Sequence, residues 1–195
     1  MNYLEIVAVI FGILSVWYAR KENILVFPFG IINVVIFIYI FFVKKLYANA
    51  GINLVYLITN IYGWYNWARP QANDEKLKIT SNSTKQNVWM ITAAIAVYFL
   101  ILWILIAANR TDLKYVHSYL PWIDASNSTL FLFATILMTI KKVENWIYWI
   151  VGNLISIPIF LIQGLYFTSI QYAVFLALAI SGYIEWKKKD KISNG

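Results

Sequence analysis

The chain is a series of apolar runs, each close to the length that crosses a lipid bilayer, separated by short polar joints. The run from Val88 to Ala108 holds 21 residues without a charge. At about 1.5 Å of rise per residue, a helix of that length spans a hydrocarbon core of roughly 30 Å. Lipid offers no hydrogen bonds to the backbone, so every backbone polar group must be paired within the protein. The pattern therefore predicts an all-α integral membrane protein.

The composition argues against several other classes. Of the 195 residues, 61% are hydrophobic and 13% are charged, whereas a soluble domain carries about 25% charged residues. The absence of cysteine leaves no disulfide framework or thiolate site. The net charge of +7 does not indicate nucleic acid as a partner, because the bases lie at the ends of apolar runs, where they orient a membrane protein. The longest polar joint, 71–87, is only 17 residues, so we expect a single transmembrane domain.

We expect seven transmembrane helices, with six as the alternative because the fifth run opens with the polar residues 126–129. The first run is expected to be a retained span, because it has no basic leader or small-residue cleavage site. The expected spans are roughly 2–19, 24–43, 46–68, 88–108, 124–140, 143–163 and 165–186.

Seven spans place the basic residues very unequally on the two faces of the membrane. One face carries twelve of them: Arg20, Lys21, Arg69, Lys76, Lys78, Lys85, Lys141, Lys142, Lys187, Lys188, Lys189 and Lys191. The other face carries four: Lys44, Lys45, Arg110 and Lys114. Because basic residues remain on the cytoplasmic side, this bias predicts a cell (inner) membrane protein with its N-terminus outside and its C-terminus in the cytoplasm.

The first and last thirds of the chain share a pattern. Leu46, Gly63 and Trp67 recur 119 residues later as Leu165, Gly182 and Trp186. The segments 22–30 and 144–152 also match, with an offset of 122. We therefore predict a parallel 3+1+3 repeat, with a first repeat in 1–69, a linker helix at 88–108 and a second repeat in 124–187. Chance is the alternative, because membrane sequences use few residue types.

Polar residues inside the apolar runs indicate a binding site. Trp146, Trp149 and Asn153 are spaced by three and then four residues, which places them on one stripe of a helix. Two indoles beside a carboxamide suit a flat, polar or cationic ring. The alternative is an interfacial tryptophan pair with an asparagine that joins two helices. The spacing alone does not decide between them.

A second polar stripe lies in the span 46–68. Asn53, Asn60 and Trp64 are spaced by seven and then four residues, so they also share a helix face. An intramembrane asparagine can equally serve only to join helices.

Several kinds of chemistry have no support in the sequence. Glu5 is the only acid that we expect well inside a span, and the single histidine, His117, falls in a joint. There is no phosphate-binding loop motif and no convergent set of acid, base and nucleophile. We therefore expect passive binding and passage, with no cofactor, no metal site and no catalytic residue.

Three stretches resemble PnuC-type vitamin transporters. They are 60–67, 136–146 (with a break at 140–142) and 163–166, and the similarity extends over almost the whole chain. The W-x-x-W-x-x-x-N pattern that marks the sixth helix of that family falls on Trp146, Trp149 and Asn153.

The resemblance implies a homotrimer of seven-helix protomers in a 3+1+3 arrangement, related to SWEET-type sugar transporters. It implies facilitated diffusion of an unphosphorylated vitamin, most often nicotinamide riboside, which a separate kinase then traps in the cytoplasm. It also implies that substrate lies between the sixth and third helices. By motif match, its contacts would include Trp146, Trp149, Asn153, Asn60 and Trp64.

One position departs from the family pattern. Riboside-type members tend to have Gln where this chain has Asn53. Shortening a buried hydrogen-bonding side chain can leave its partner unpaired at roughly 1–3 kcal/mol, which is enough to change ligand choice. Thiamine therefore remains an alternative to nicotinamide riboside. A membrane sensor or scaffold that docks a protein through the joint 71–87 or the C-terminal tail is the alternative from another class.

Overall fold

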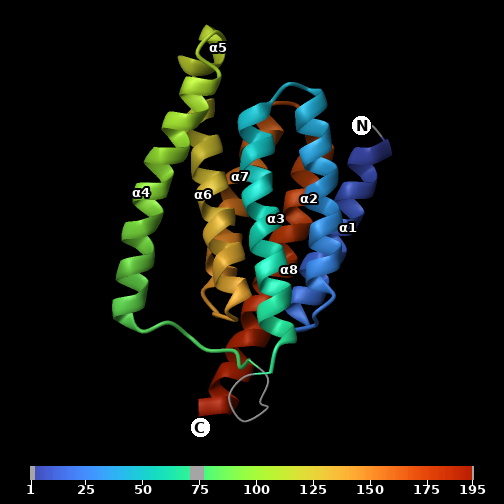
Figure 1. Cartoon of the computed structure of the whole chain (residues 1–195), viewed down its shortest axis with the longest axis vertical. Coiled ribbons are helices and arrows are strands. Elements are labelled where there is room, and N and C mark those ends of the chain that lie inside the picture. The colour runs from blue at the N-terminus through green and yellow to red at the C-terminus, as the bar shows by residue number, and fades with distance from the viewer. Residues whose placement is uncertain (1–2, 71–76, 195) are drawn as a thin grey trace.

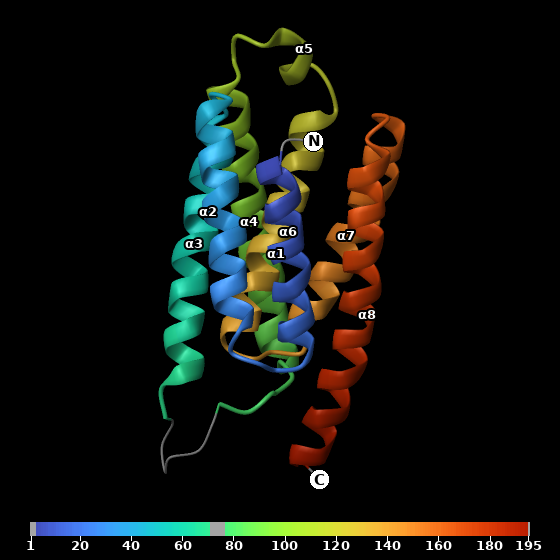
Figure 2. The ribbon, with the colours of Figure 1, turned by 90° about the vertical axis from the view of Figure 1, so that its right-hand side faces the viewer.

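The computed structural model describes residues 3–70 and 77–194. Its regular secondary structure is helical, apart from an isolated β-bridge between Thr80 and Lys142. The helices are α1 (Tyr3–Arg20), α2 (Val26–Val43), α3 (Tyr47–Ala68), α4 (Thr84–Ala108), the single turn α5 (Leu113–Val116), α6 (Leu120–Thr139), α7 (Asn145–Ile162) and α8 (Tyr166–Asn194). The long helices run side by side, and α1 begins at the end of the bundle opposite to the end of α8 (Figures 1 and 2).

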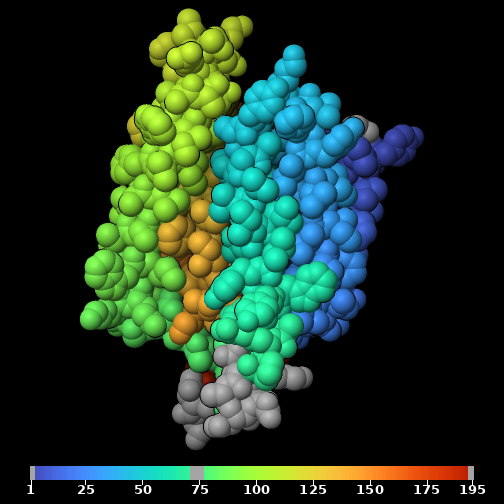
Figure 3. All heavy atoms as spheres, in the orientation of Figure 1, coloured from blue at the N-terminus to red at the C-terminus, as the bar shows by residue number. Residues whose placement is uncertain are grey.

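Six of the long helices form a closed ring. Going round it, α1 contacts α2, α2 contacts α3, α3 contacts α6, α6 contacts α7, α7 contacts α8, and α8 returns to α1. Helix α4 lies outside the ring and packs mainly on α6. In the space-filling view, α6 is visible in the gap between α4 and α3 (Figure 3). The ring leaves room for a site at its centre, and α4 is excluded from it.

Five of these helices are long and apolar enough, by length and composition alone, to cross a membrane: α1, α2, α4, α7 and α8. The remaining long helices, α3 and α6, carry more polar side chains, including Asn53, Asn60 and Asn127. These side chains face the interior of the ring rather than its periphery. Part of the lower hydropathy of α3 and α6 therefore comes from side chains that face the interior of the ring.

The two short turns of the first half have the same hydrogen bonds as two turns of the second half. Glu22 and Lys141 both have positive φ, 58° and 52°, and so do Lys45 and Gly164, at 60° and 73°. Around each pair the backbone bonds match at an offset of 119: Glu22 N donates to Ala19 O, and Lys141 N donates to Met138 O. The offset of 122 expected for the segment after Glu22 is therefore wrong. Glu22 and Asn23 lie in the turn before α2, whereas Glu144 and Asn145 lie at the start of α7. The second Glu-Asn pair is therefore three residues out of register with the first.

Three helix boundaries differ from the expected ones. Helix α6 begins at Leu120 rather than near 124, with Pro121 in its first turn, where a missing N–H costs nothing. Helix α4 begins at Thr84, where Ser83 and Gln86 form a reciprocal capping box. Helix α8 continues through its lysines to Asn194. Position 2 of the first expected span and Lys76 lie outside the described residues.

One end of the bundle carries the α1–α2 turn (21–25), the α6–α7 turn (140–144) and the last turns of α8. We call it the basic end, because most of the lysines and arginines of the chain lie there. Thr80 of the α3–α4 joint accepts from Val143 N at 3.0 Å and donates to Lys141 O at 3.1 Å, so the described part of this joint is fixed to the α6–α7 turn.

Candidate substrate cavity

The ring of six helices encloses a cavity of about 390 Å³, and none of the residues that line it comes from α4. Much of its polar surface comes from amide side chains: Asn33, Asn49, Asn53, Asn60, Asn127, Asn153 and Gln171. Much of its apolar surface comes from aromatic rings: Phe37, Phe41, Phe131, Trp146, Trp149, Phe160 and Phe175. A mostly apolar cavity of this size with a few polar groups is typical of small-molecule sites.

The predicted stripe of α7 faces this cavity. Trp146, Trp149 and Asn153 all line it. Asn153 is 1% exposed, and neither its Nδ2 nor its Oδ1 has a hydrogen-bond partner in the protein. A buried amide without partners costs roughly 1–3 kcal/mol. A ligand in the cavity that offers a donor and an acceptor would recover those hydrogen bonds.

Trp149 is the end of a row of stacked rings. Its ring lies 5.1 Å from that of Phe131 with 25° between the planes. Phe131 is stacked 6.2 Å from Tyr172, and Tyr172 is stacked 5.1 Å from Phe160. Gly152 makes this packing possible, because a Cβ there would lie 2.3 Å from Phe131 Cε1. Phe131 and Tyr172 have no sequence signal that separates them from ordinary core aromatics.

Trp146 has a different role from Trp149. Its ring is buried and makes an edge contact with Trp186, at 5.5 Å and 88°. Its Nε1 has no hydrogen-bond partner in the protein. The two indoles therefore do not form one continuous wall. Trp149 belongs to the side of the cavity and Trp146 to its floor.

Two of the three residues of the second predicted stripe also reach the cavity. Asn53 and Asn60 line it, with Tyr56 between them. Each amide donates to the backbone one turn earlier: Asn53 Nδ2 to Asn49 O at 2.9 Å, and Asn60 Nδ2 to Tyr56 O at 2.8 Å. These bonds leave both Oδ1 atoms available as acceptors. Gly30 of α2 makes room for Asn60, whose Oδ1 would lie 2.8 Å from a Cβ at that position.

Trp64 does not lie in the cavity. It is 42% exposed on the outside of α3 and is absent from the lining. The cavity ends near Asn60, because one turn further the helix packs against other helices, with Gly63 facing Phe27 and Thr139. The prediction that Trp64 faces the substrate site together with Asn53 and Asn60 is wrong for this reason.

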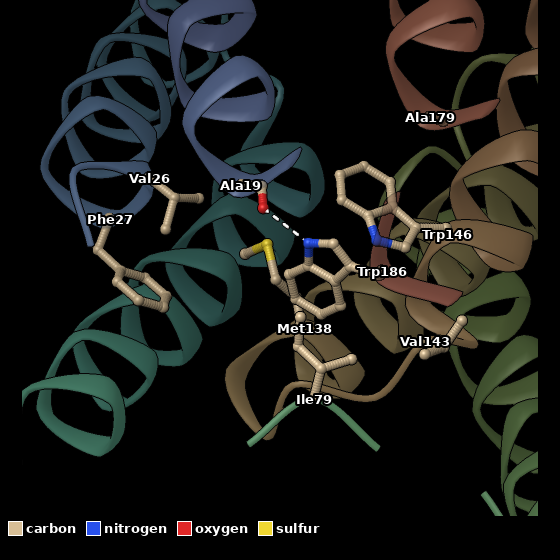
Figure 4. Close-up of a cluster of buried hydrophobic side chains, with 9 residues drawn as sticks. All are labelled: Ala19, Val26, Phe27, Ile79, Met138, Val143, Trp146, Ala179 and Trp186. Carbon is tan, nitrogen blue, oxygen red and sulfur yellow. Dashed lines mark hydrogen bonds between the residues drawn. The ribbon is translucent and has the colours of Figure 1, made fainter. Parts of the chain in front are cut away.

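The cavity is closed toward the basic end by an apolar cluster (Figure 4). Its buried members are Ala19, Val26, Phe27, Ile79, Met138, Val143, Trp146, Ala179 and Trp186. Four of them, Ala19, Val26, Met138 and Trp146, also line the cavity and form its floor. A substrate that leaves through the basic end must therefore pass this cluster.

Beyond the cluster, the half-buried Glu22 carboxylate pairs with two lysines. Lys141 Nζ lies 2.7 Å from Glu22 Oε1 and 4.5 Å from the centre of the Trp67 ring, and Lys189 Nζ lies 2.8 Å from Glu22 Oε2. Burial alone would raise the pKa of the Glu22 carboxyl, but the hydrogen bonds and charges of the two lysines hold that pKa below its ordinary value. The carboxylate is thus ionised and joins both halves of the chain at neutral pH.

Asp124 also lines the cavity, and the sequence analysis missed it. It lies in the second turn of α6, where Oδ2 accepts a hydrogen bond from the Tyr115 hydroxyl at 2.9 Å. Asp124 therefore lies within a long helix, whereas the sequence pattern places it at the very beginning of an expected span. The signal was present as an acid followed by the polar run 126–129, but this run was assigned to the beginning of the span. Asn127 of the same run donates to Ser156 Oγ at 3.0 Å, and its buried Oδ1 has no partner.

The described residues include no cluster of three or more His, Cys, Asp or Glu side chains able to hold a metal ion. Apart from Asp124, the lining residues carry no ionisable group other than the phenols of Tyr56 and Tyr172. The arrangement is suited to binding an aromatic, hydrogen-bonding molecule by stacking and by amide contacts.

Comparison with known proteins identifies a family. The family model described as "Nicotinamide mononucleotide transporter" matches residues 2–188. The chain is 32% identical to the nicotinamide riboside transporter PnuC of Escherichia coli (strain K12) over 204 residues, which cover 95% of this chain and 85% of that protein. It is 24% identical to the riboflavin/roseoflavin transporter RibM of Streptomyces davaonensis, over 93% of this chain and 83% of that protein.

The fold also matches a solved structure. The crystal structure of the vitamin B3 transporter PnuC superposes with a TM-score of 0.72 and 25% sequence identity. The match covers 98% of this chain and 83% of that chain. The predicted resemblance to PnuC-type transporters is thus confirmed by sequence and by structure.

Proposed function

This chain belongs to the nicotinamide mononucleotide transporter family, and on that premise we propose that it carries unphosphorylated nicotinamide riboside across the membrane by facilitated diffusion. It is an all-helical, multi-pass membrane protein of a transporter family, not of an enzyme family. The E. coli relative and a relative from Neisseria mucosa, 27% identical to this chain, are both named nicotinamide riboside transporters. In this proposal a separate kinase phosphorylates the vitamin and so keeps it in the cytoplasm.

The lining of the cavity favours the riboside over the mononucleotide. Among the described lining residues there is no lysine, arginine or histidine to hold a phosphate. Phosphate sites usually depend on such bases or on backbone N–H groups at a helix N-terminus. A nicotinamide ring and a ribose offer aromatic stacking, an amide and hydroxyls instead, which match the groups of this cavity.

The observation that carries the proposal is the state of Asn153. Its carboxamide is buried beside the stacked ring of Trp149 with both polar atoms unpaired. We propose that Asn153, Asn53 and Asn60 hydrogen-bond the vitamin while Trp149 stacks on it and Trp146 supports it from below. Trp64 is not part of this site.

We further propose that all seven long helices span the membrane in a parallel 3+1+3 arrangement. Helices α1–α3 and α6–α8 would be the two repeats, and α4 the linker outside the ring. The hydrogen-bonded turns that match at an offset of 119 support this proposal, as does the equivalence of the α3–α6 and α8–α1 contacts. The repeat boundaries near 1–69 and 124–187 would then move to the helix ends described above.

The basic end would face the cytoplasm of the cell (inner) membrane, with the N-terminus outside. The support is the unequal distribution of lysine and arginine, because such residues are retained on the cytoplasmic side. The vitamin would then enter beside the α2–α3 turn, close to Phe41 and Asn49, and leave through the cluster around Trp186.

A homotrimer is proposed from the family resemblance alone. Native mass spectrometry of the protein in lipid nanodiscs tests it, with three copies as the expected mass.

Calorimetry on the purified protein tests the binding function. We expect nicotinamide riboside to bind with micromolar or better affinity, and Trp149→Ala to weaken it at least about tenfold, because a stacking partner is lost. Trp103→Ala is the matched control, since Trp103 is 67% exposed on α4, outside the ring. If nicotinamide riboside gives no heat with the wild-type protein, the proposal fails. Heat with thiamine instead would identify that vitamin as the substrate.

Liposomes separate a transporter from a sensor or scaffold. Vesicles that contain the protein, a riboside kinase and ATP should accumulate the phosphorylated vitamin. Binding without accumulation would support the sensor. Residues 71–76 of the joint suggested as a protein dock lie outside the described residues.

A further inference from the structure

The cavity contains one formal charge, and that charge is negative. Asp124 is the only charged side chain among the described residues that line it. The other polar groups of the lining are amides, hydroxyls and phenols. The binding site assigned above therefore carries an excess of negative charge that no lining residue balances.

No ion pair of the described residues compensates Asp124. Arg20 pairs with Glu185, Lys44 with Glu5, and Lys141 and Lys189 with Glu22, so none of these bases is directed at Asp124. Asp124 has instead a single neutral partner, the Tyr115 hydroxyl, which donates to Oδ2. Its Oδ1 accepts no hydrogen bond from the described residues. A phenol can orient a carboxylate, but it cannot neutralise it.

A carboxylate in a largely apolar site is costly unless a positive charge accompanies it. The Trp149 ring, at the end of the stacked row, lines the same site, and an aromatic face attracts cations as well. Both features favour a flat organic cation over a neutral ring of the same shape, and both disfavour an anion. The pyridinium of nicotinamide riboside and the thiazolium of thiamine both carry such a fixed positive charge.

Resting on the proposed transport function, we infer that Asp124 is the counter-ion of the cationic ring of the substrate and restricts this carrier to cationic vitamins. Tyr115 is a positioning residue, which holds the carboxylate toward the cavity from the joint between α4 and α6. Neutral and phosphorylated forms of the same vitamin are excluded by charge rather than by size.

The test compares nicotinamide riboside with its reduced dihydro form, which has nearly the same shape but a neutral ring. Binding of each to the purified full-length protein is measured by calorimetry. The wild-type protein should prefer the cation by at least about tenfold. Asp124→Asn should remove most of that preference, mainly by weakening the cation, and should leave the affinity for the neutral form within about threefold.

Two further variants complete the test. Tyr115→Phe removes the hydrogen bond that positions the carboxylate but keeps the charge, so it should reduce the preference for the cation less than Asp124→Asn does, without abolishing it. Glu5→Gln removes a carboxylate that pairs with Lys44 and does not line the cavity, so it should behave as the wild type.

The outcomes are distinct. A wild-type protein that binds both forms equally overturns the inference without any variant. Equal loss of both forms in Asp124→Asn also overturns it, because the residue would then act through shape or hydrogen bonding. A wild-type protein that binds neither nicotinamide riboside nor thiamine overturns the proposed function and this inference with it.

Discussion

Trp67 and Trp186 each donate an indole hydrogen bond to the backbone of the other half of the chain. The acceptor lies near the end of α6 for Trp67 and near the end of α1 for Trp186. Trp67 Nε1 donates to Met138 O at 3.2 Å, and Trp186 Nε1 donates to Ala19 O at 3.1 Å. Both the donors and the acceptors are 119 residues apart. The two rings lie 6.1 Å from each other. This reciprocal pair ties the halves together at the floor of the cavity, on the path that we propose for the vitamin.

The indole hydrogen bonds of Trp186 should contribute measurably to stability. Trp186→Phe keeps a large ring but removes the donor to Ala19 O and Arg20 O, so the free energy of unfolding should fall by roughly 1–3 kcal/mol. Thermal unfolding in detergent measures the change. Trp103→Phe, at an exposed position of α4, should leave the midpoint nearly unchanged. Equal shifts in the two variants would contradict a special role for the reciprocal pair.

Gly182 is required by the same cluster. A Cβ there would lie 2.6 Å from Trp146 Cη2, so Gly182→Ala must displace a buried indole and should cost about 1–3 kcal/mol. Gly51→Ala is the matched control, because nothing lies within 4 Å of a Cβ at this helical position. There alanine should be neutral or stabilising by up to about 1 kcal/mol. Melting temperatures of the two variants that move in the same direction would contradict this account.

The sequence was sufficient to predict the helices and the stripe of α7. Apolar runs of bilayer length have few alternatives to helices, and a helical period of 3.6 residues places Trp146, Trp149 and Asn153 on one face whatever the tertiary structure. The direction in which that face points was not predictable from period alone. That direction depends on how six helices close into a ring, and the ring is held by contacts between residues far apart in the sequence.

The errors have equally specific causes. Trp64 follows the period of Asn60, but the cavity stops before the next turn because Gly63 packs closely on Phe27. Asp124 precedes a polar run that was assigned to the beginning of a span. In fact, residues 124–129 lie within α6, and several of them face the cavity instead of lipid. In both cases the extent of the cavity along the helix decides whether a residue lines it, and a local sequence pattern does not predict that extent.

The Glu22 carboxylate should make stability depend on acid pH. Its pKa in the folded protein is lowered below the ordinary value near 4.5 by Lys141 and Lys189, despite its burial. A lowered folded pKa means that the carboxylate stabilises the protein fully above the ordinary pKa. This contribution is lost as the pH falls through the folded value. Melting temperatures of the wild type and of Glu22→Gln should therefore differ at neutral pH and converge in acid. A difference that stays constant from neutral to acid pH would contradict this ionic role.

Asn153 should show opposite effects on stability and on binding. Its amide is buried with both polar atoms unpaired, so these missing hydrogen bonds lower the stability of the ligand-free protein. Asn153→Leu has a similar volume and no polar atoms, and it should therefore leave the melting temperature of the ligand-free protein unchanged or raise it. The same variant should weaken vitamin binding by roughly 10- to 100-fold, because about 1–3 kcal/mol of hydrogen bonding with the ligand is lost. Melting with and without ligand measures both quantities in one experiment.

Asn66→Leu is the contrasting variant. Asn66 lies outside the lining, and its Nδ2 donates to Thr139 O at 2.9 Å, so this substitution should lower the melting temperature instead. If Asn153→Leu melts well below the wild type without ligand, the amide is a structural residue, and the vitamin does not depend on it.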